Sequence, residues 1–175
     1  MPIASRVRSI PDYPKPGILF RDITTLIGHG EGLADTVAHL CDRVLAAGAD
    51  AVAGIEARGF IFGAAVASQL RLPFLPIRKP GKLPVPVLAI DYALEYGTDT
   101  LELDPGAIAS GARVVLIDDL VATGGTAAAA VELLVTAGAA VDLALFVIDL
   151  PDLAGADRLR STGLAVEALM HFPGH

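Results

Sequence analysis

The stretch of this sequence best suited to chemistry is VVLIDDLVATGGT, residues 114–126, in which an apolar run ends in two carboxylates and a glycine-rich loop follows. Gly124 and Gly125 can turn the backbone tightly at the entrance of an Ala-rich helix, where unpaired amides and the helix dipole favour an anion. Thr123 and Thr126 add hydroxyl donors. The loop therefore predicts a phosphate site, although in isolation it also fits a glycine turn capped by threonine.

The two carboxylates, Asp118 and Asp119, restrict which molecule the loop can hold. Carboxylates accept hydrogen bonds and repel a phosphate, so they need a partner that brings hydroxyl groups or a metal ion. A sugar phosphate meets both needs, because its phosphate suits the loop and its vicinal ribose hydroxyls suit the acids. The alternative is a solvated strand end. The loop lacks the lysine of a Walker A motif and the G-x-G-x-x-G of dinucleotide folds.

Further charged residues stand in three other segments. Arg58, in GIEARGFIFG, offers guanidinium donors suited to a second phosphate, although an arginine in a turn is commonly a surface residue. RKPGKLP gathers Arg78, Lys79 and Lys82, which suggests a basic flap that closes on a pyrophosphate and excludes water, or else a solvated charge run. Glu95, in YALEYG, is either a polar surface residue or a group that handles a proton.

Composition limits the class of protein that can carry these groups. The chain has 175 residues, 53% of them hydrophobic, which fits a single domain with a sizeable core. A formal charge of -7 argues against binding to nucleic acid or an anionic membrane surface. The longest apolar region is interrupted by charges, no signal peptide is visible, and the single cysteine, Cys41, excludes an internal disulfide. Together these features favour a cytoplasmic protein.

The elements that must position these groups alternate between strands and helices. Residues 31–47 carry an apolar helical stripe that includes Cys41, with Gly48 as the expected C-cap. The proline-rich start, residues 10–24, predicts an ordered arm that is not helical. The other expected helices span 60–70 and 126–137, and the expected strands span 50–55, 72–79, 112–118, 140–149 and 163–169, with a hairpin over 87–103.

This alternation predicts an α/β fold whose central, mainly parallel sheet is flanked by helices, in one domain covering residues 1–175. In such sheets ligands lie beyond the carboxyl ends of the strands. Asp118, Asp119 and the turn at 56–59 are therefore expected at one working edge.

The opening stretch resembles the signature for 5-phosphoribosyl 1-pyrophosphate (PRPP) in type I phosphoribosyltransferases. PDYPKPGILFRDIT, GIEARGF, RKPGKLP, YALEYG and DDLVATGGT are together similar, in order and spacing, to the adenine-specific branch of that family, and they cover most of residues 9–137. The resemblance implies formation of AMP and pyrophosphate from adenine and PRPP with Mg²⁺, in a homodimer. It also implies an N-terminal arm, residues 1–30, that contributes to a base-binding hood, and a flexible flap over 78–100.

Roles for single residues follow from the same resemblance. The ribose and the 5'-phosphate of PRPP or AMP would be held by Asp118, Asp119, Ala122, Thr123, Gly124, Gly125 and Thr126. Pyrophosphate would contact Glu56, Ala57, Arg58, Lys79 and Lys82. Adenine would be recognised by the main chain of Leu19 and Arg21, with Phe20 covering its ring. Glu95 and Arg58 are the implied catalytic residues, and Tyr96 belongs to the flap.

Two departures from the family pattern stand out. Pro80 occupies a position that often carries another cation, and DLAGADRL follows the family's C-terminal pattern only loosely, so no role is assigned after residue 137. The four histidines lack the spacing of a metal site, so Mg²⁺ is expected on substrate oxygens, water and an aspartate.

Adenine is favoured over a 6-oxo purine by the distribution of lysine. The 6-oxygen of a 6-oxo purine accepts a hydrogen bond and so requires a donor such as lysine. Lysine occurs only at positions 15, 79 and 82, so none follows the phosphate loop. Two rival functions stay open. One is transfer to xanthine, hypoxanthine or orotate, and the other is a regulator that senses PRPP without catalysis.

Overall fold

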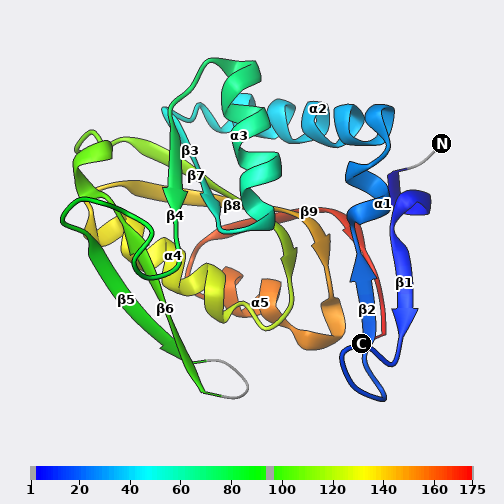
Figure 1. Ribbon diagram of the computed structural model, residues 1–175. Coiled ribbons are helices and arrows are strands. Elements are labelled where there is room, and N and C mark those ends of the chain that lie inside the picture. The colour runs from blue at the N-terminus through cyan, green and yellow to red at the C-terminus, as the bar shows by residue number, and fades with distance from the viewer. Residues whose placement is uncertain (1–2, 94–96, 175) are drawn as a thin grey trace.

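The computed structural model of the protein describes residues 3–93 and 97–174 (Figure 1). A five-stranded sheet in the order β4-β3-β7-β8-β9 forms its centre, and every neighbouring pair of these strands is parallel. This confirms the predicted α/β class with a mainly parallel central sheet. The strands are β3 (Ala51–Ile55), β4 (Phe74–Ile77), β7 (Arg113–Val121), β8 (Ala140–Asp149) and β9 (Ala165–His171).

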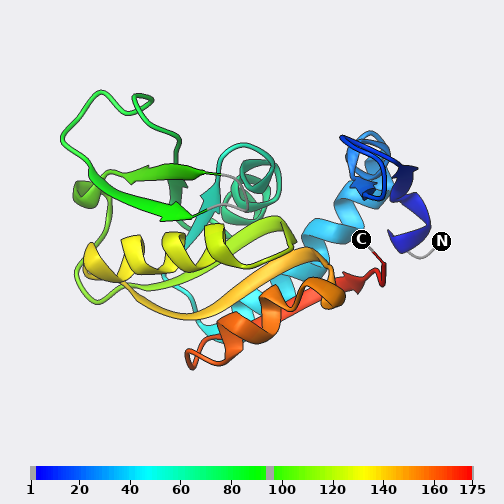
Figure 2. The same ribbon diagram turned by 90° about the horizontal axis from the view of Figure 1, so that it is seen from below.

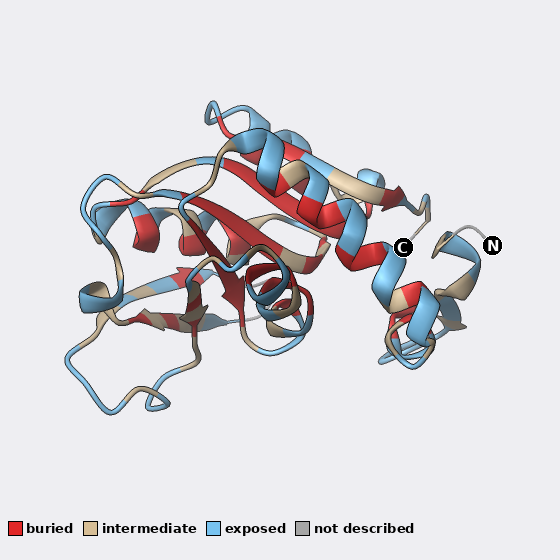
Figure 3. Ribbon diagram, turned by 90° about the horizontal axis from the view of Figure 1, so that it is seen from above, coloured by how far each residue is buried: buried red, intermediate tan, exposed pale blue. Residues whose placement is uncertain are grey.

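Helices cover both faces of this sheet. One face packs against α2 (Gly30–Ala47) and α3 (Arg58–Leu70), and the other packs against α4 (Gly125–Thr136) and α5 (Gly155–Arg160). Figure 3 shows the buried strands between these layers. Because both faces are covered, the central strands carry nearly continuous apolar runs, and all five residues of β3 are buried.

Helix α2 illustrates how closely local sequence sets an element. Val37, Leu40, Cys41 and Val44 lie on one buried stripe that packs on the sheet. His29 caps the helix start by accepting a hydrogen bond from the Gly32 amide, and Gly48 ends it in the left-handed conformation at φ +61°. The predicted helix, its C-cap and the core position of Cys41 are confirmed.

The N-terminal arm is a small antiparallel hairpin beside short helices. It consists of η1 (Ile3–Arg6), β1 (Arg8–Pro11), β2 (Leu19–Asp22) and α1 (Thr24–Ile27). An ordered arm was predicted here, but its strand pairing was not. Figures 1 and 2 place this arm near the C-terminal end of β9, so the two ends of the chain lie in one region.

A second hairpin, β5 (Leu88–Ala93) and β6 (Thr98–Leu103), confirms the predicted antiparallel pair. Tyr92, Leu101 and Leu103 belong to the hydrophobic cluster that also contains the buried face of α4. Figure 2 shows the hairpin lying along α4. Two short helices, η2 (Pro105–Ala107) and η3 (Pro151–Leu153), complete the described elements.

The structure differs from the sequence-based expectations at several element ends. Strand β7 continues through both aspartates to Val121, three residues beyond the predicted end at 118, because it stays paired with β8. Helix α3 begins at Arg58 and not at residue 60. Helix α5 was not predicted. Among the described helices, none combines the length and the hydrophobicity that crossing a membrane requires.

Candidate active site

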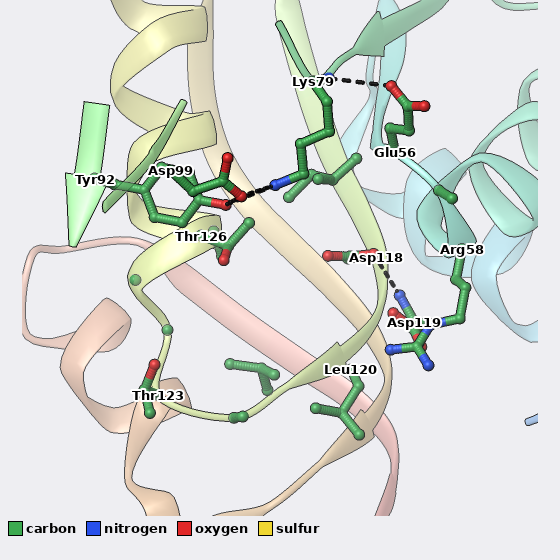
Figure 4. Close-up of a pocket in the computed structure, with 17 residues that line it drawn as sticks. Glu56, Arg58, Lys79, Tyr92, Asp99, Asp118, Asp119, Leu120, Thr123 and Thr126 are labelled. Atoms are coloured by element: carbon green, nitrogen blue, oxygen red, sulfur yellow. Dashed lines mark hydrogen bonds and ion pairs between the residues drawn. The ribbon is translucent and has the colours of Figure 1, made fainter. Parts of the chain in front are cut away.

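A pocket of about 380 Å³ opens at the carboxyl edge of the sheet (Figure 4). Its walls come from four parts of the chain: the end of β3, the segment after β4, the β5–β6 hairpin, and the end of β7 with the start of α4. The lining residues are Ile55, Glu56, Ala57, Arg58, Lys79, Tyr92, Asp99, Asp118, Asp119, Leu120, Val121, Ala122, Thr123, Gly124, Gly125, Thr126 and Ala127. The predicted working edge is thus a real concavity.

The loop at 122–126 joins β7 to α4 and forms one side of the pocket. Gly124 adopts φ +83°, a left-handed conformation that favours glycine, and α4 begins at the next residue. The first amides of a helix have no partner within it, so those that follow Gly124 are available to an anion. Figure 4 shows the side chains of Thr123 and Thr126 along the same loop. This is the geometry expected of a phosphate site.

Asp118 and Asp119 are adjacent residues near the carboxyl end of β7. Asp119 is 5% exposed, and the Asp119 amide donates to Oδ1 of Asp118 at 2.9 Å. Burial raises the pKa of Asp118 well above its usual value, and the charge of Asp119 raises it further. Two adjacent carboxylates, one buried and one partly buried, therefore favour a ligand that donates hydrogen bonds to them.

Glycine at position 59 lets helix α3 approach these acids. A Cβ at Gly59 would lie 2.7 Å from Oδ1 of Asp118 and 3.0 Å from the carbonyl oxygen of Ile117. The first distance is shorter than real Cβ atoms show and the second is tight, so the glycine of the EARG turn lets the helix pack closely on β7.

Arg58, the first residue of α3, forms an ion pair with the second acid. Its Nε lies 2.7 Å from Oδ2 of Asp119, and its side chain is 45% exposed. Burial raises the pKa of Asp119, although Arg58 acts in the opposite direction. The pair uses Nε, and a guanidinium has further N–H donors to offer a ligand.

Glu56 connects the same turn to the basic segment. Its Oε2 accepts from the Lys79 amide at 3.0 Å and from Nε of Arg78 at 3.3 Å. The hydrogen bond from the Lys79 backbone lowers the pKa of Glu56, and the bond from the Arg78 side chain adds to this effect. Glu56 is therefore an ionised anchor for the segment at Arg78 and Lys79. The Glu56–Ala57 peptide bond is cis.

Tyr92 and Asp99 line the pocket and were not singled out from the sequence. The Lys79 ammonium pairs with Oδ2 of Asp99 and also donates to the Tyr92 hydroxyl at 2.9 Å. The Tyr92 hydroxyl donates to the same Asp99 oxygen at 3.1 Å. Strand alternation in the sequence could have pointed to Asp99, because Asp99 shares the inward face of β6 with Leu101 and Leu103.

Other predicted site residues lie outside this pocket. Lys82 is exposed, and its carbonyl accepts from Nη1 of Arg78 at 3.3 Å. Leu19, Phe20 and Arg21 stand on β2, where the Phe20 ring lies 6.0 Å from Cζ of Arg58. The arm is therefore near the pocket mouth without lining it.

The side chain of Arg21 points toward the C-terminal segment. Its Nη2 donates to the Pro173 carbonyl at 2.8 Å, and its Cζ lies 4.8 Å from the Phe172 ring. Two predicted residues of the flap, Glu95 and Tyr96, fall outside the described part of the chain.

The site offers oxygen ligands but no closed metal cage. No group of three or more His, Cys, Asp or Glu side chains within residues 3–93 and 97–174 is arranged to hold a metal ion. The two adjacent carboxylates, Asp118 and Asp119, fit an ion such as Mg²⁺, which keeps several waters and is shared with substrate oxygens.

Comparison with known proteins agrees with this geometry. Residues 26–162 match the phosphoribosyl transferase domain family. The adenine phosphoribosyltransferase of Novosphingobium aromaticivorans is 69% identical over 169 residues, which span 97% of this chain and 95% of that protein.

Solved structures give the same result. The crystal structure of adenine phosphoribosyltransferase from Thermoanaerobacter pseudethanolicus has 42% identity and a TM-score of 0.91, covering 97% of this chain and 98% of that one. The Saccharomyces cerevisiae enzyme, complexed with an imino-altritol bisphosphate and adenine, has 34% identity and a TM-score of 0.88 and covers 96% of each chain. This chain therefore belongs to the adenine phosphoribosyltransferase family.

Proposed function

We propose that this protein transfers the 5-phosphoribosyl group of PRPP to adenine, forming AMP and releasing pyrophosphate. The observation that carries the proposal is one pocket in which a phosphate-binding loop, two adjacent carboxylates and the cations Arg58 and Lys79 face a common space. PRPP has a phosphate, a diol and a pyrophosphate in the same succession. The 69% identical relative is named for this activity.

Binding of the ribose phosphate uses the loop and the acids. The amides and hydroxyls at 123–126 receive the 5'-phosphate at the start of α4. Asp118 and Asp119 accept hydrogen bonds from the ribose hydroxyls. These bonds favour the ionised form of the acids, which opposes the upward shift that burial imposes on their pKa.

Stabilisation of the leaving group is assigned to the cations. In the bond change, adenine N9 attacks the anomeric carbon while the bond from that carbon to the pyrophosphate oxygen breaks, and the departing oxygen keeps the electron pair. Arg58 and Lys79 offer positive charge to the pyrophosphate that leaves. In the structure each cation is paired with an acid, Asp119 or Asp99, so pyrophosphate competes with those acids for it.

Two parts of the mechanism rest on the family resemblance. Mg²⁺, when bound, would neutralise phosphate oxygens as a Lewis acid, with Asp118 or Asp119 as its protein ligand. Glu95 is the group assigned to the purine proton, and it lies outside the described residues. A homodimer and a cytoplasmic location also remain predictions from the sequence.

The choice of base is supported by the relatives and by the lysine distribution. The Saccharomyces cerevisiae structure is complexed with adenine. No lysine follows the phosphate loop to serve a 6-oxo group. For this chain, we place the adenine ring between β2, with Phe20, and the pocket mouth near Arg58.

A base panel tests the proposal directly. Purified protein with PRPP and Mg²⁺ is given labelled adenine, hypoxanthine, xanthine or orotate in separate reactions, and nucleotide and pyrophosphate are measured. We expect AMP and pyrophosphate in equal amounts with adenine and at least about a hundredfold lower kcat/KM with the others. Equal use of a 6-oxo purine would overturn the assignment of the base. PRPP binding without product from any base would support the sensor alternative.

A further inference from the structure

Helix α5, which the sequence did not predict, contacts the phosphate loop through its first residue. A Cβ on Gly155 would lie 2.2 Å from the carbonyl oxygen of Ala122, 2.7 Å from the amide nitrogen of Gly124 and 2.7 Å from the carbonyl carbon of Thr123. Real Cβ atoms essentially never approach a neighbour below 3.0 Å. The backbone of α5 therefore packs directly on the backbone of the loop.

The contact is equally tight from the other side. A Cβ on Gly124 would lie 2.8 Å from the carbonyl oxygen of Gly155 and 3.2 Å from its Cα. Gly124 also requires φ +83°, so both its conformation and its surroundings exclude a side chain. Gly155 is buried, so the contact belongs to the packed interior beside the loop.

Arg158, one turn further along α5, ties the loop to the segment before the helix. Its Nε donates to the carbonyl of Thr123 at 2.9 Å, and its Nη2 donates to the carbonyl of Leu153 at 2.6 Å. One guanidinium thus joins the carbonyls of two separate segments. The Thr123 carbonyl is thus held by α5, while the residues that follow Gly124 line the pocket.

We propose that Gly155 and Arg158 are positioning residues that hold the phosphate loop in its binding shape, the first by permitting close contact and the second by fixing the Thr123 carbonyl. This proposal rests on the proposed function, since it assigns the loop to the 5'-phosphate. Neither residue lines the pocket, so both act through the loop. An anion site made of main-chain amides binds well only when those amides are already oriented, because the loop must otherwise be ordered when the ligand binds.

Different parts of the site bind the two ends of PRPP. The loop serves the ribose 5-phosphate end, whereas Arg58 and Lys79 serve the pyrophosphate end. Loss of the α5 contact should therefore weaken binding of the ribose 5-phosphate end and leave binding of pyrophosphate unchanged.

Arg158→Gln is the main test, because Arg158 is exposed and its replacement leaves the core intact. Isothermal titration measures affinity for ribose 5-phosphate and, separately, for pyrophosphate with Mg²⁺. We expect affinity for ribose 5-phosphate to fall about tenfold, the effect of losing hydrogen bonds from a charged group, and affinity for pyrophosphate to change less than about twofold. In turnover, KM for PRPP should rise while KM for adenine stays the same.

Arg160→Gln is the matched control. It removes the same charge from the same helix, but Arg160 donates to the Val166 carbonyl and to Asp157 and does not contact the loop. We expect wild-type affinity for both ligands. Arg158→Lys keeps the charge but cannot span both carbonyls, so its affinity for ribose 5-phosphate should lie between those of the wild type and Arg158→Gln.

Gly155→Ala tests the second residue. We expect it to lower the affinity for ribose 5-phosphate more than Arg158→Gln does, because the added methyl group must displace the loop. Thermal unfolding confirms that the variant is folded. Wild-type affinity in Arg158→Gln, full retention in Arg158→Lys, or equal loss for both ligands would each overturn the proposal. Failure of the function itself is read separately, from the absence of AMP formation by the wild-type protein.

Discussion

At the scale of single residues, the site contains two neighbouring carboxylates whose ionisation is unfavourable in the folded chain and is compensated only in part. Asp118 and Asp119 are adjacent carboxylates, the first partly buried and the second buried, and of the two Asp119 forms an ion pair with the guanidinium of Arg58. The wild-type sequence keeps both acids although burial and mutual repulsion oppose their ionisation. A site that binds a diol explains this arrangement, since the ligand supplies the missing donors.

Asp118→Asn should separate stability from function. A carboxyl whose pKa is higher in the folded chain destabilises that chain when ionised. The cost is absent below the unfolded value, about 3.9, where both states are protonated, and it grows as pH rises through the folded value. The variant should therefore unfold at the same temperature as the wild type near pH 4 and at a higher temperature near pH 8, while activity falls about a hundredfold.

Thermal unfolding across this pH range, with activity at pH 8, checks the prediction. Asp142→Asn, which replaces an exposed aspartate on β8, is the control and should show no pH-dependent gain. A variant that is less stable than the wild type at pH 8 would contradict the electrostatic cost assigned to Asp118.

At the scale of elements, the β5–β6 hairpin packs on the central sheet through buried apolar side chains, and polar contacts join the two at the pocket. Lys79 follows β4, Tyr92 stands on β5 and Asp99 on β6, and their side chains bond to one another beside the phosphate loop. Hydrogen bonds to Asp99 and Tyr92 raise the pKa of Lys79 even though burial opposes this. The ammonium is thus kept charged and held inside the pocket.

A double substitution tests whether Asp99 and Lys79 act as one unit. Lys79→Met should weaken pyrophosphate binding about tenfold, since it removes a cation and leaves the Asp99 carboxylate facing the ligand. Adding Asp99→Asn should restore about threefold of that loss, because the uncompensated negative charge is gone. Calorimetry with pyrophosphate and Mg²⁺ measures both effects. A further loss in the double variant would mean that Asp99 contributes to binding by itself.

At the scale of the whole molecule, the two ends of the chain are joined at the arm. Arg21 on β2 bonds to the Ser9 hydroxyl and to the Pro173 carbonyl and lies over the Phe172 ring. The Gly174 amide donates to Asp152, which fixes the same tail. Because β2 carries the segment predicted to recognise adenine, we expect the C-terminal tail to influence adenine binding although it lies far from β2 in the sequence.

Deletion of residues 173–175 tests this connection. KM for adenine should rise about threefold to tenfold as the arm loses its hydrogen bond to the tail, while KM for PRPP stays unchanged. Ser9→Ala, which removes the other partner of Arg21, should shift KM for adenine in the same direction. Steady-state kinetics with each substrate varied in turn decides the matter, and an increase confined to PRPP would contradict the role given to the arm.

The sequence by itself determined the α/β class, most of the elements and the phosphate loop, because each depends on local rules. Alternating apolar strands and helices, a glycine-rich turn and paired acids are readable within a few residues of one another. The turn at Glu56, Ala57 and Arg58 lines the pocket at the edge of the sheet where the sequence predicted it, and Lys79 lines the same pocket.

Only the tertiary structure decided how distant segments complete the site. The inward position of Asp99, the contact of Gly155 with the loop and the bond from Arg21 to Pro173 join residues 20, 31 and 152 positions apart. Such contacts depend on how strands and helices pack in three dimensions. A loose C-terminal motif gave no reason to assign Arg158 a role, whereas the packing of α5 on the loop gives one.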